Sequence, residues 1–346
     1  MHVLAIRFSA FGDVAMTIPV IWSAAKQYPQ HQFTVLSRES MRPLFLQMPE
    51  NVTFRGVNLK QTKYKGIGGM WRLAGELIEE NRFDAVADLH DVLRSQMLRL
   101  FFQLRGITCC HINKGKTAKR RLTRSHHKIM QQLPTSFDRY RDVFSLLGLP
   151  IQIDFTSIYA AGQKGDFSCI ASAVPARQPD ERWIGIAPFA AHQGKIYPLE
   201  MMEQVVIGLG HHKSIRIFLF GAGEEEEKVL SDWATRYPWT TRPKDLRMEK
   251  ELILMSHLDL MVSMDSANMH LASLVNTPVL SIWGATHPYC GFMGYGQPEG
   301  NALQINGLTC RPCSIFGNKP CLRGDYACLR NITPERVIQR VLSLLA

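Results

Sequence analysis

The residues best suited to chemistry stand in a short polar stretch that follows an apolar run. Asp265-Ser266-Ala267-Asn268-Met269-His270 comes after the run that begins at Leu258, and helix-forming residues continue it to Asn276. An aspartate or serine at this place can cap a helix, and the N–H groups of a helix start can bind a phosphate. His270 falls about one turn into the helix, within reach of the same ligand. Taken alone, the stretch is explained more simply by a capped helix with a buried histidine.

A second apolar run, Val279 to Trp283, follows this helix, so the segment has the order strand, helix, strand. That order predicts one βαβ unit of a parallel sheet. The same alternation runs through both halves, with strands predicted at 2–8, 33–37, 52–57, 83–89, 183–188, 214–220 and 260–263, and helices at 14–28, 41–47, 70–80, 92–104, 136–148, 198–209, 224–237 and 250–256. We therefore expect an α/β protein with two doubly wound, Rossmann-like parallel sheets facing a central cleft.

The chain has 346 residues, which exceeds one ordinary core and predicts two domains. A stretch rich in Ala, Gly, Ser and Pro, 160–180, marks the linker region. We expect an N-terminal Rossmann-like domain over 1–170 and a C-terminal one over 171–332. Residues 333–346 are predicted to form a closing amphipathic helix, which begins with the capping pair Thr333-Pro334 and is free to pack back on the N-terminal domain.

The formal net charge is +10, and one span of the chain matches it. Between Asp91 and Asp138 there is no acidic residue, and the ten basic residues there are Arg94, Arg99, Arg105, Lys114, Lys116, Lys119, Arg120, Arg121, Arg124 and Lys128. Such a local field attracts partners rich in phosphate or carboxylate, although a solvated basic loop is the plainer explanation. The lack of interleaved aromatic residues in 113–128, and of a recognised RNA- or DNA-binding module, argues against nucleic acid.

Composition places the chain among folded globular proteins, with 46% hydrophobic and 20% charged residues. No apolar run approaches the ~20 residues that a membrane-spanning helix needs. The first residues have the pattern of a buried strand and not that of a signal peptide. Eight cysteines without a signal peptide indicate a reducing compartment, so we expect a cytoplasmic protein.

Four of the cysteines stand close together in a Gly- and Pro-rich stretch: Cys310, Cys313, Cys321 and Cys328. The first two form a Cys-x2-Cys knuckle, and a knuckle followed by two more thiols can bind a structural zinc ion in a tetrahedral site. The second pair lacks the short spacing of a zinc ribbon. The sequence therefore leaves zinc, four free thiols and a disulfide open.

Ligands of doubly wound sheets bind beyond the carboxyl ends of the strands. Four loops hold that position: 9–13 in the first half, and 188–195, 221–225 and 265–270 in the second. The first three carry Asp13, Lys195 and Glu225. Each of these also has a structural explanation, as a helix cap, a surface lysine and a solvated first helical turn respectively.

Four segments together resemble glycosyltransferase family 9, the heptosyltransferase family, which has the GT-B fold. They are Arg7 to Val14; Asp84 to His90 with Leu93-Arg94-Ser95; Ala187-Pro188 through Gly194-Lys195 to Pro198; and Asp265-Ser266-Ala267 with His270. The last is similar to the family signature Asp-Ser/Thr-Gly-x-x-His, with Ala267 in place of the glycine. The segments keep their order, and the resemblance covers nearly the whole chain.

The resemblance implies an inverting, metal-independent transfer, in which an acceptor hydroxyl attacks the anomeric carbon of a nucleotide sugar and the nucleoside diphosphate leaves. It makes Asp13 the general base and Lys195 the cation for the leaving diphosphate. The donor-binding residues that it implies are Ala191, Lys195, Glu225, Asp265, Ser266, Ala267 and His270. The acceptor-binding residues are Ser9, Gly12, Arg94, Lys114, Lys116, Arg120 and Arg121. No cofactor is implied for catalysis, in agreement with the lack of an Asp-x-Asp metal-binding motif.

The activity implied is transfer of heptose from ADP-heptose onto an acidic, lipid-linked saccharide of the lipopolysaccharide inner core. The basic span then serves to hold this polyanionic acceptor at the inner face of the cytoplasmic membrane, where each Lys or Arg gains about 1 kcal/mol. We expect a monomer that contacts the membrane peripherally. Two alternatives stay open: another sugar-nucleotide enzyme on the same fold, with a different donor or as an epimerase, and a basic nucleic-acid-binding protein.

Overall fold

The computed structural model describes residues 1–243 and 246–346, and the chain divides into two compact units. The N-terminal unit contains Met1–Lys114 and Pro134–Ile158, and the C-terminal unit contains Gly115–Leu133 and Tyr159–Ala346. Residues 115–133, called the basic segment below, interrupt the N-terminal unit in sequence but belong to the C-terminal unit. The region predicted as a linker, 160–180, also lies in the C-terminal unit.

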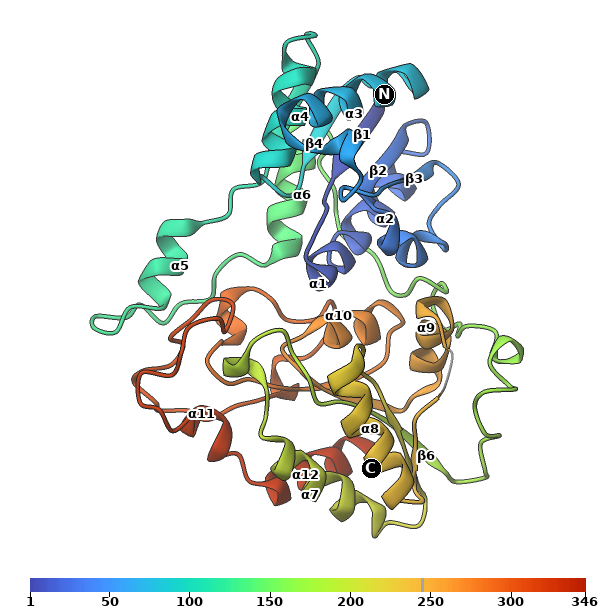
Figure 1. Cartoon of the computed structure of the whole chain (residues 1–346), viewed down its shortest axis with the longest axis vertical. Coiled ribbons are helices and arrows are strands. Elements are labelled where there is room, and N and C mark those ends of the chain that lie inside the picture. Colours follow the sequence, from blue (N-terminus) through green and yellow to red (C-terminus); the bar gives the residue numbers. More distant parts are fainter. Residues whose placement is uncertain (244–245) are drawn as a thin grey trace. The chain divides into compact units, whose positions relative to one another are not determined.

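The N-terminal unit is built on a five-stranded parallel sheet (Figure 1). The strands are β1 (His2–Ile6), β2 (Gln32–Arg38), β3 (Val52–Val57), β4 (Ala85–Asp88) and β5 (Thr108–His111), and they lie in the order β3-β2-β1-β4-β5. The helices are α1 (Phe11–Ala15), α2 (Ile18–Gln27), α3 (Gly66–Glu80), α4 (Leu93–Gln103) and α6 (Ser136–Leu146), with 3-10 turns η1 (Glu39–Phe45) and η2 (Thr62–Tyr64). Strands buried on both faces explain why the sequence reads as continuous apolar runs.

Helices cover both faces of this sheet. On one face, Leu4 and Ile6 of β1 join a core that includes side chains of α3 and α4. On the other face, Phe33 of β2 meets Phe144 of α6, with their ring centroids 6.3 Å apart. The sheet is therefore doubly wound, as predicted, and its strand ends are held between two helical layers.

The C-terminal unit has a six-stranded sheet in the order β11-β10-β9-β6-β7-β8, and every neighbouring pair is parallel. Its strands are β6 (Arg182–Ala187), β7 (Ile215–Leu219), β8 (Thr240–Thr241), β9 (Leu260–Met264), β10 (Val279–Ile282) and β11 (Ala302–Leu303). The helices are α5 (Lys116–Leu122), α7 (Leu199–Gly210), α8 (Glu224–Arg236), α9 (Met248–His257), α10 (Ala267–Leu274), α11 (Ala327–Arg330) and α12 (Pro334–Leu345). The 3-10 turns are η3 (Phe167–Cys169), η4 (Gln193–Lys195), η5 (Pro288–Cys290) and η6 (Glu299–Asn301). The α/β fold class with two parallel sheets is thereby confirmed.

The closing helix α12 is part of the C-terminal core. Thr333 caps it through its hydroxyl, which accepts a hydrogen bond from the N–H of Arg336 at 3.3 Å, and Pro334 occupies its first turn, as predicted. Val337 and Val341 are buried in the core of the unit, and the helix packs on α7 and β9. Ile338, Leu342, Leu344 and Leu345 of α12 are partly buried against the same core. That α12 also packs on the N-terminal domain stays a prediction.

The winding of each sheet reverses between two central strands. In the N-terminal sheet these strands are β1 and β4, with Ile6 opposite Asp88, and in the C-terminal sheet they are β6 and β9, with Ala187 opposite Ser263. The predicted ligand loops 9–13, 188–195 and 265–270 all follow these strands. A ligand of a doubly wound sheet binds at such a reversal point.

No helix in the described part of the chain is both long and apolar enough to cross a membrane.

Candidate active site

The opening turn of the N-terminal unit pairs a carboxylate with a buried cation. Asp13 lies in the first turn of α1, and its Oδ2 accepts a hydrogen bond from the N–H of Ala10, 3.2 Å away. The same oxygen lies 2.8 Å from Nη2 of Arg7, the residue that follows β1. The side chain of Asp13 is 28% exposed and that of Arg7 is 10% exposed. The Asp13 carboxylate is therefore accessible to solvent, whereas the Arg7 guanidinium that binds it is largely buried.

Arg7 connects this turn to two other parts of the N-terminal unit. Its Nη1 donates a hydrogen bond to the carbonyl of Leu89, just after β4, at 2.7 Å. Its Cζ lies 5.8 Å from the ring centroid of Tyr140 on α6, and the Tyr140 hydroxyl donates to the carbonyl of Asp13 at 3.3 Å. Sequence reasoning gave Arg7 no role of its own. The signal that could have found it is a basic residue directly after the first strand, on the same sheet edge as Asp13.

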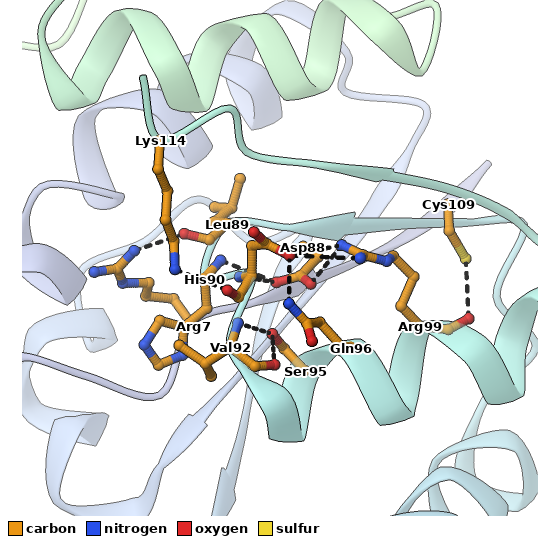
Figure 2. A network of polar contacts seen from close by, with 11 residues as sticks. Arg7, Asp88, Leu89, His90, Val92, Ser95, Gln96, Arg99, Cys109 and Lys114 are labelled. Carbon is orange, nitrogen blue, oxygen red and sulfur yellow. Dashed lines mark hydrogen bonds and ion pairs between the residues drawn. The ribbon is translucent and has the colours of Figure 1, made fainter. Parts of the chain in front are cut away.

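A network of polar contacts holds the loop after β4, as Figure 2 shows from close by. Asp88 is fully buried; its carboxylate accepts hydrogen bonds from the N–H groups of His90 (2.9 Å) and Asp91 (2.8 Å) and lies 3.0 Å from Nη1 of Arg99. Asp88 therefore builds the loop and does not face a ligand. The ring of His90 also touches the opening turn, because its Nδ1 accepts a hydrogen bond from the N–H of Phe8 at 3.4 Å.

His90 stays neutral near physiological pH. Burial, together with the positive charges of Arg7 and Lys114, lowers the pKa of His90 to about 3. Since Nδ1 accepts a hydrogen bond, the ring proton of the neutral form belongs on Nε2. Lys114 is held in the same loop by a 2.7 Å hydrogen bond from its Nζ to the carbonyl of Asp91 (Figure 2).

The residues predicted to bind the acceptor are divided between the units. Ser9, Gly12, Arg94 and Lys114 belong to the N-terminal unit, and Lys116, Arg120 and Arg121 to the C-terminal unit. Ser9 and Gly12 lie in the opening turn with Asp13, whereas Arg94 is exposed in the first turn of α4. Lys116, Arg120 and Arg121 are exposed on α5.

Helix α5 packs on the C-terminal unit through a small apolar cluster. Leu122 of α5 is buried with Leu133 and Cys290, and Nζ of Lys119 lies 5.1 Å from the ring centroid of Phe292. The charged face of α5, with Lys116, Arg120 and Arg121, is left exposed. The basic segment is thus an ordered surface of this unit.

At the reversal point of the C-terminal sheet, a lysine lies against a buried carboxylate. Nζ of Lys195 is 3.2 Å from Oδ2 of Asp265, which directly follows β9. The Thr286 hydroxyl donates to the same oxygen at 2.8 Å. The side chain of Asp265 is 4% exposed and that of Lys195 is 16% exposed. Asp265 therefore orients Lys195, and the more exposed partner here is the cation.

Helix α10 starts beside this pair. Ser266 is its N-cap residue, but no side chain caps the helix, because the Ser266 hydroxyl lies 3.2 Å from that of Ser263 instead. The first N–H groups of a helix have no partner within it, and together with the helix dipole they favour an anion. Ala267 is the first helical residue, and His270 is buried in the first turn.

Two glycines shape the turn that carries Lys195. A Cβ on Gly194 would lie 2.8 Å from the carbonyl oxygen of Gly317 and 2.9 Å from Cβ of Ala285. Gly317 itself has φ of +74°, and a Cβ there would lie 2.4 Å from Cγ of Lys195. The stem of Lys195 therefore lies directly on the backbone of the cysteine-rich stretch, which limits where its ammonium group can go.

The remaining predicted donor residues lack such contacts. Ala191 is exposed in the loop after β6. Glu225 is an exposed residue of the first turn of α8 and pairs with Lys228 of the same helix, at 2.7 Å. The neighbouring Glu226 folds back over its own turn, where it accepts a hydrogen bond from the N–H of Ala222 at 2.8 Å.

The four late cysteines line one pocket of about 430 Å³, counting its open part: Cys310, Cys313, Cys321 and Cys328. All four are free thiols. Burial raises the pKa of Cys328 to about 11, and it also raises the pKa of Cys313. Across residues 1–243 and 246–346, no three Cys, His, Asp or Glu side chains are close enough together to hold one metal ion. The thiols share a pocket, but an assembled tetrahedral site is not formed.

Each of the two parallel sheets has a reversal point. One carries an accessible carboxylate, and the other carries a lysine beside the start of a helix. This arrangement is typical of enzymes that bind nucleotide-linked substrates. The family model described as glycosyltransferase family 9 (heptosyltransferase) matches residues 70–319. The chain therefore belongs to glycosyltransferase family 9 and is a glycosyltransferase.

Individual relatives are similar over the whole chain. The protein is 23% identical over 371 residues to lipopolysaccharide heptosyltransferase 2 of Escherichia coli K12, covering 100% of this chain and 99% of that one. It is 25% identical over 372 residues to lipooligosaccharide heptosyltransferase 2 of Haemophilus ducreyi, covering 100% of both. The structure of E. coli ADP-heptose lps heptosyltransferase II superimposes with a TM-score of 0.72 at 19% identity, over 100% of this chain and 98% of that one. The last likeness shows the GT-B fold that the sequence implied.

Proposed function

We propose that the protein is an inverting heptosyltransferase that moves heptose from ADP-heptose onto an acidic saccharide of the lipopolysaccharide inner core. The names of its relatives support the sugar, the donor and the lipopolysaccharide. One observation carries the chemistry: the N-terminal unit exposes the anion of its ion pair, and the C-terminal unit exposes the cation of its own. A base and a phosphate holder are the two groups that the reaction requires.

Asp13 is the proposed general base. As the acceptor oxygen attacks the anomeric carbon, its proton moves to the Asp13 carboxylate, and the bond from the anomeric carbon to the diphosphate breaks with its electron pair. A positioned base contributes roughly 10²–10⁴-fold in rate. Arg7 is a positioning residue, because it holds one carboxylate oxygen at 2.8 Å while the side chain stays partly exposed.

Lys195 and the start of α10 are the proposed holders of the leaving diphosphate. Lys195 supplies a charge that Asp265 orients, and the N–H groups at Ser266 and Ala267 supply donors and the positive end of a helix dipole. These groups can stabilise the developing negative charge without a metal ion, so we expect transfer to continue in excess chelator. Glu225 and His270 complete the proposed donor site, with Glu225 on the ribose hydroxyls.

The basic segment is the proposed contact with the acceptor and the membrane. Its charged residues Lys116, Arg120 and Arg121 are exposed on an ordered helix, and the partner that they suit is a polyanionic lipid-linked saccharide. The proposed location is the inner face of the cytoplasmic membrane, where the enzyme would act as a peripheral monomer. Cosedimentation with vesicles that contain anionic lipid tests the contact, since neutral vesicles should not bind.

A structural zinc ion at the four late cysteines is supported by their spacing and by the pocket that they share. Their arrangement is not that of a formed site, so no step of the reaction is assigned to the metal. Elemental analysis of purified protein tests this proposal. About one equivalent of zinc supports it, and far less zinc together with four titratable thiols rejects it.

The test of the function has two stages. Thermal shift with ADP-, GDP- and UDP-sugars identifies the donor, because a bound ligand raises apparent stability. Transfer to an inner-core saccharide is then followed by mass spectrometry, with ADP-heptose as the expected donor. Turnover of the donor without an acceptor favours an epimerase. Oligonucleotide binding that falls steeply with salt, with no nucleotide-sugar binding, favours a nucleic-acid-binding protein.

A further inference from the structure

One pocket of the C-terminal unit is lined partly by the end of the basic segment, and no ligand group has been assigned to it above. It has a volume of about 900 Å³, counting its open mouth, and it is lined by Ser125, His127, Lys128, Met130, His287, Ile305, Asn306, Gly307, Leu308, Thr309 and Arg311. None of these residues is acidic, and two of them, Lys128 and Arg311, are cations at neutral pH. A concave surface with this composition selects for an anion.

Arg311 is a buried cation that lines this pocket and also the pocket of the four late cysteines. It is 5% exposed, and its Nε and Nη1 donate to the carbonyls of Gly284 (2.7 Å) and Ile305 (3.2 Å). Its Nη2 has no hydrogen-bond partner among residues 1–243 and 246–346. The guanidinium group of Arg311 is charged at neutral pH. A buried charged donor that lacks an acceptor is costly, and a bound anion would relieve that cost.

His287 and Lys128 add further donors. Nδ1 of His287 accepts a hydrogen bond from the N–H of Tyr289 at 3.0 Å, so the proton of the neutral ring lies on Nε2. Nζ of Lys128 donates one hydrogen to the carbonyl of Pro312 at 2.9 Å and has two more to offer. Backbone atoms thus hold all three side chains, and the pocket gains donors suited to a group with several oxygens.

The pocket adjoins the donor site within the same unit. Arg311 donates to the carbonyl of Gly284, two residues after β10 ends. The N–H of the next residue, Ala285, donates to the carbonyl of Gly194 at 2.8 Å. His287 directly follows Thr286, which holds Asp265. The backbone that shapes the pocket therefore also supports the turn of Lys195.

We infer that this pocket binds a phosphate or carboxylate group carried by the saccharide acceptor, at a site separate from the donor diphosphate. The inference rests on the proposed function for its assignment to the acceptor. The anion site itself rests only on the buried guanidinium, the two further donors and the absence of acidic residues from the lining. Phosphate and carboxylate share the same recognition chemistry here, and either can come from a substrate sugar or from free anions.

Titration with inorganic phosphate tests the site directly. The titration is followed by phosphorus NMR, on protein whose donor site is saturated with nucleoside diphosphate. Lys128→Gln and His287→Asn should each weaken phosphate binding about tenfold. Lys213→Gln, which removes the same charge from an exposed position after α7, should leave it unchanged. Arg311→Lys is a further variant, accepted only if its circular dichroism matches the wild type. Absence of saturable phosphate binding, or equal weakening by Lys213→Gln, overturns the site.

Kinetics then separates the two sources of the anion. If the anion belongs to the acceptor, Lys128→Gln raises the acceptor KM about tenfold and leaves the donor KM and kcat unchanged. If phosphate binding weakens while the acceptor KM stays constant, the pocket holds a free anion and its assignment to the acceptor is wrong. Because the phosphate titration needs no turnover, its outcome is independent of whether the proposed transfer is correct.

Discussion

The two reversal points carry the same kind of ion pair with opposite exposure. In the N-terminal unit, Arg7 is the buried partner and Asp13 the more exposed one, at 10% and 28%. In the C-terminal unit, Asp265 is buried and Lys195 more exposed, at 4% and 16%. Both pairs lie beside a helix that starts just after a central strand. The same structural device therefore presents an anion on one unit and a cation on the other.

This difference indicates that each ion pair serves function more than stability. A buried ion pair contributes little net stability, because desolvation offsets its attraction. What it does provide is orientation of the partner that remains exposed. The exposed carboxylate suits proton abstraction, and the exposed ammonium suits a phosphate.

The largest expected effect tests whether Asp13 acts as the general base. Asp13→Asn keeps the size of the side chain and removes the basic oxygen. We expect kcat to fall by about 10³-fold, while the affinity for the donor changes less than about threefold. Initial rates and calorimetry measure the two effects. Asp142→Asn, on an exposed carboxylate of α6, is the matched control and should retain full activity. Wild-type turnover by Asp13→Asn would remove Asp13 as the base.

In the second pair, substitution of the exposed residue should weaken ligand binding, whereas in the first pair it should lower kcat. Lys195→Gln removes the exposed cation, and we expect the Kd for nucleoside diphosphate to rise about 10- to 100-fold, the range for losing a hydrogen bond to a charged group. Calorimetry with nucleoside diphosphate measures the change, and Lys213→Gln serves as the charge-matched control. If Lys195→Gln lowers kcat with unchanged diphosphate affinity, the division of roles between the two pairs is wrong.

The sequence predicted the layout of both sheets because buried parallel strands read as apolar runs. The strand predicted at 52–57 is β3, and that predicted at 260–263 lies within β9. It missed β5, an edge strand of four residues with the sequence Thr-Cys-Cys-His, which lacks an apolar pattern. It also missed α5, where Leu122 is the one buried residue of the helix, so no helical period is visible. The helix predicted at 14–28 is divided into α1 and α2, with Pro19 in the first turn of α2.

For the site, the sequence located the loops but not the pairings within them. Asp13 and Lys195 could be placed at strand ends from the alternation of elements. That Arg7 is buried beneath Asp13, or that Gly317 is pressed against the stem of Lys195, depends on segments distant along the chain. The sequence places Arg7 directly after the first strand, but its burial, like the Gly317 contact, follows from packing in three dimensions.

The Gly317 contact offers a sharper test of how Lys195 is held. Gly317→Ala adds a Cβ at 2.4 Å from Cγ of Lys195 and also a strained φ. Gly324→Ala is the matched control, since Gly324 has φ of +77° and no atom within 4 Å of a Cβ. We expect Gly317→Ala to lose about 2 kcal/mol more stability than the control, as overpacking does, and to weaken diphosphate binding as well. Denaturant unfolding and calorimetry measure both. Equal losses in the two variants would mean that the Lys195 stem is free to move.

The smallest effect expected concerns His90, which touches the turn of the first pair. Its pKa of about 3 lies below that of an unfolded histidine, about 6.5, so unfolding takes up a proton between these two values. Stability should therefore fall as pH drops from about 6.5 towards 3, and this loss is absent above pH 6.5. His90→Gln cannot titrate. Between pH 6.5 and 5 we expect the wild type to lose about 1 kcal/mol more unfolding free energy than the variant, after allowance for partial exposure of the ring. Urea unfolding at the two pH values measures the difference. Parallel losses would show that His90 takes up its proton over the same pH range in the folded protein as in the unfolded chain.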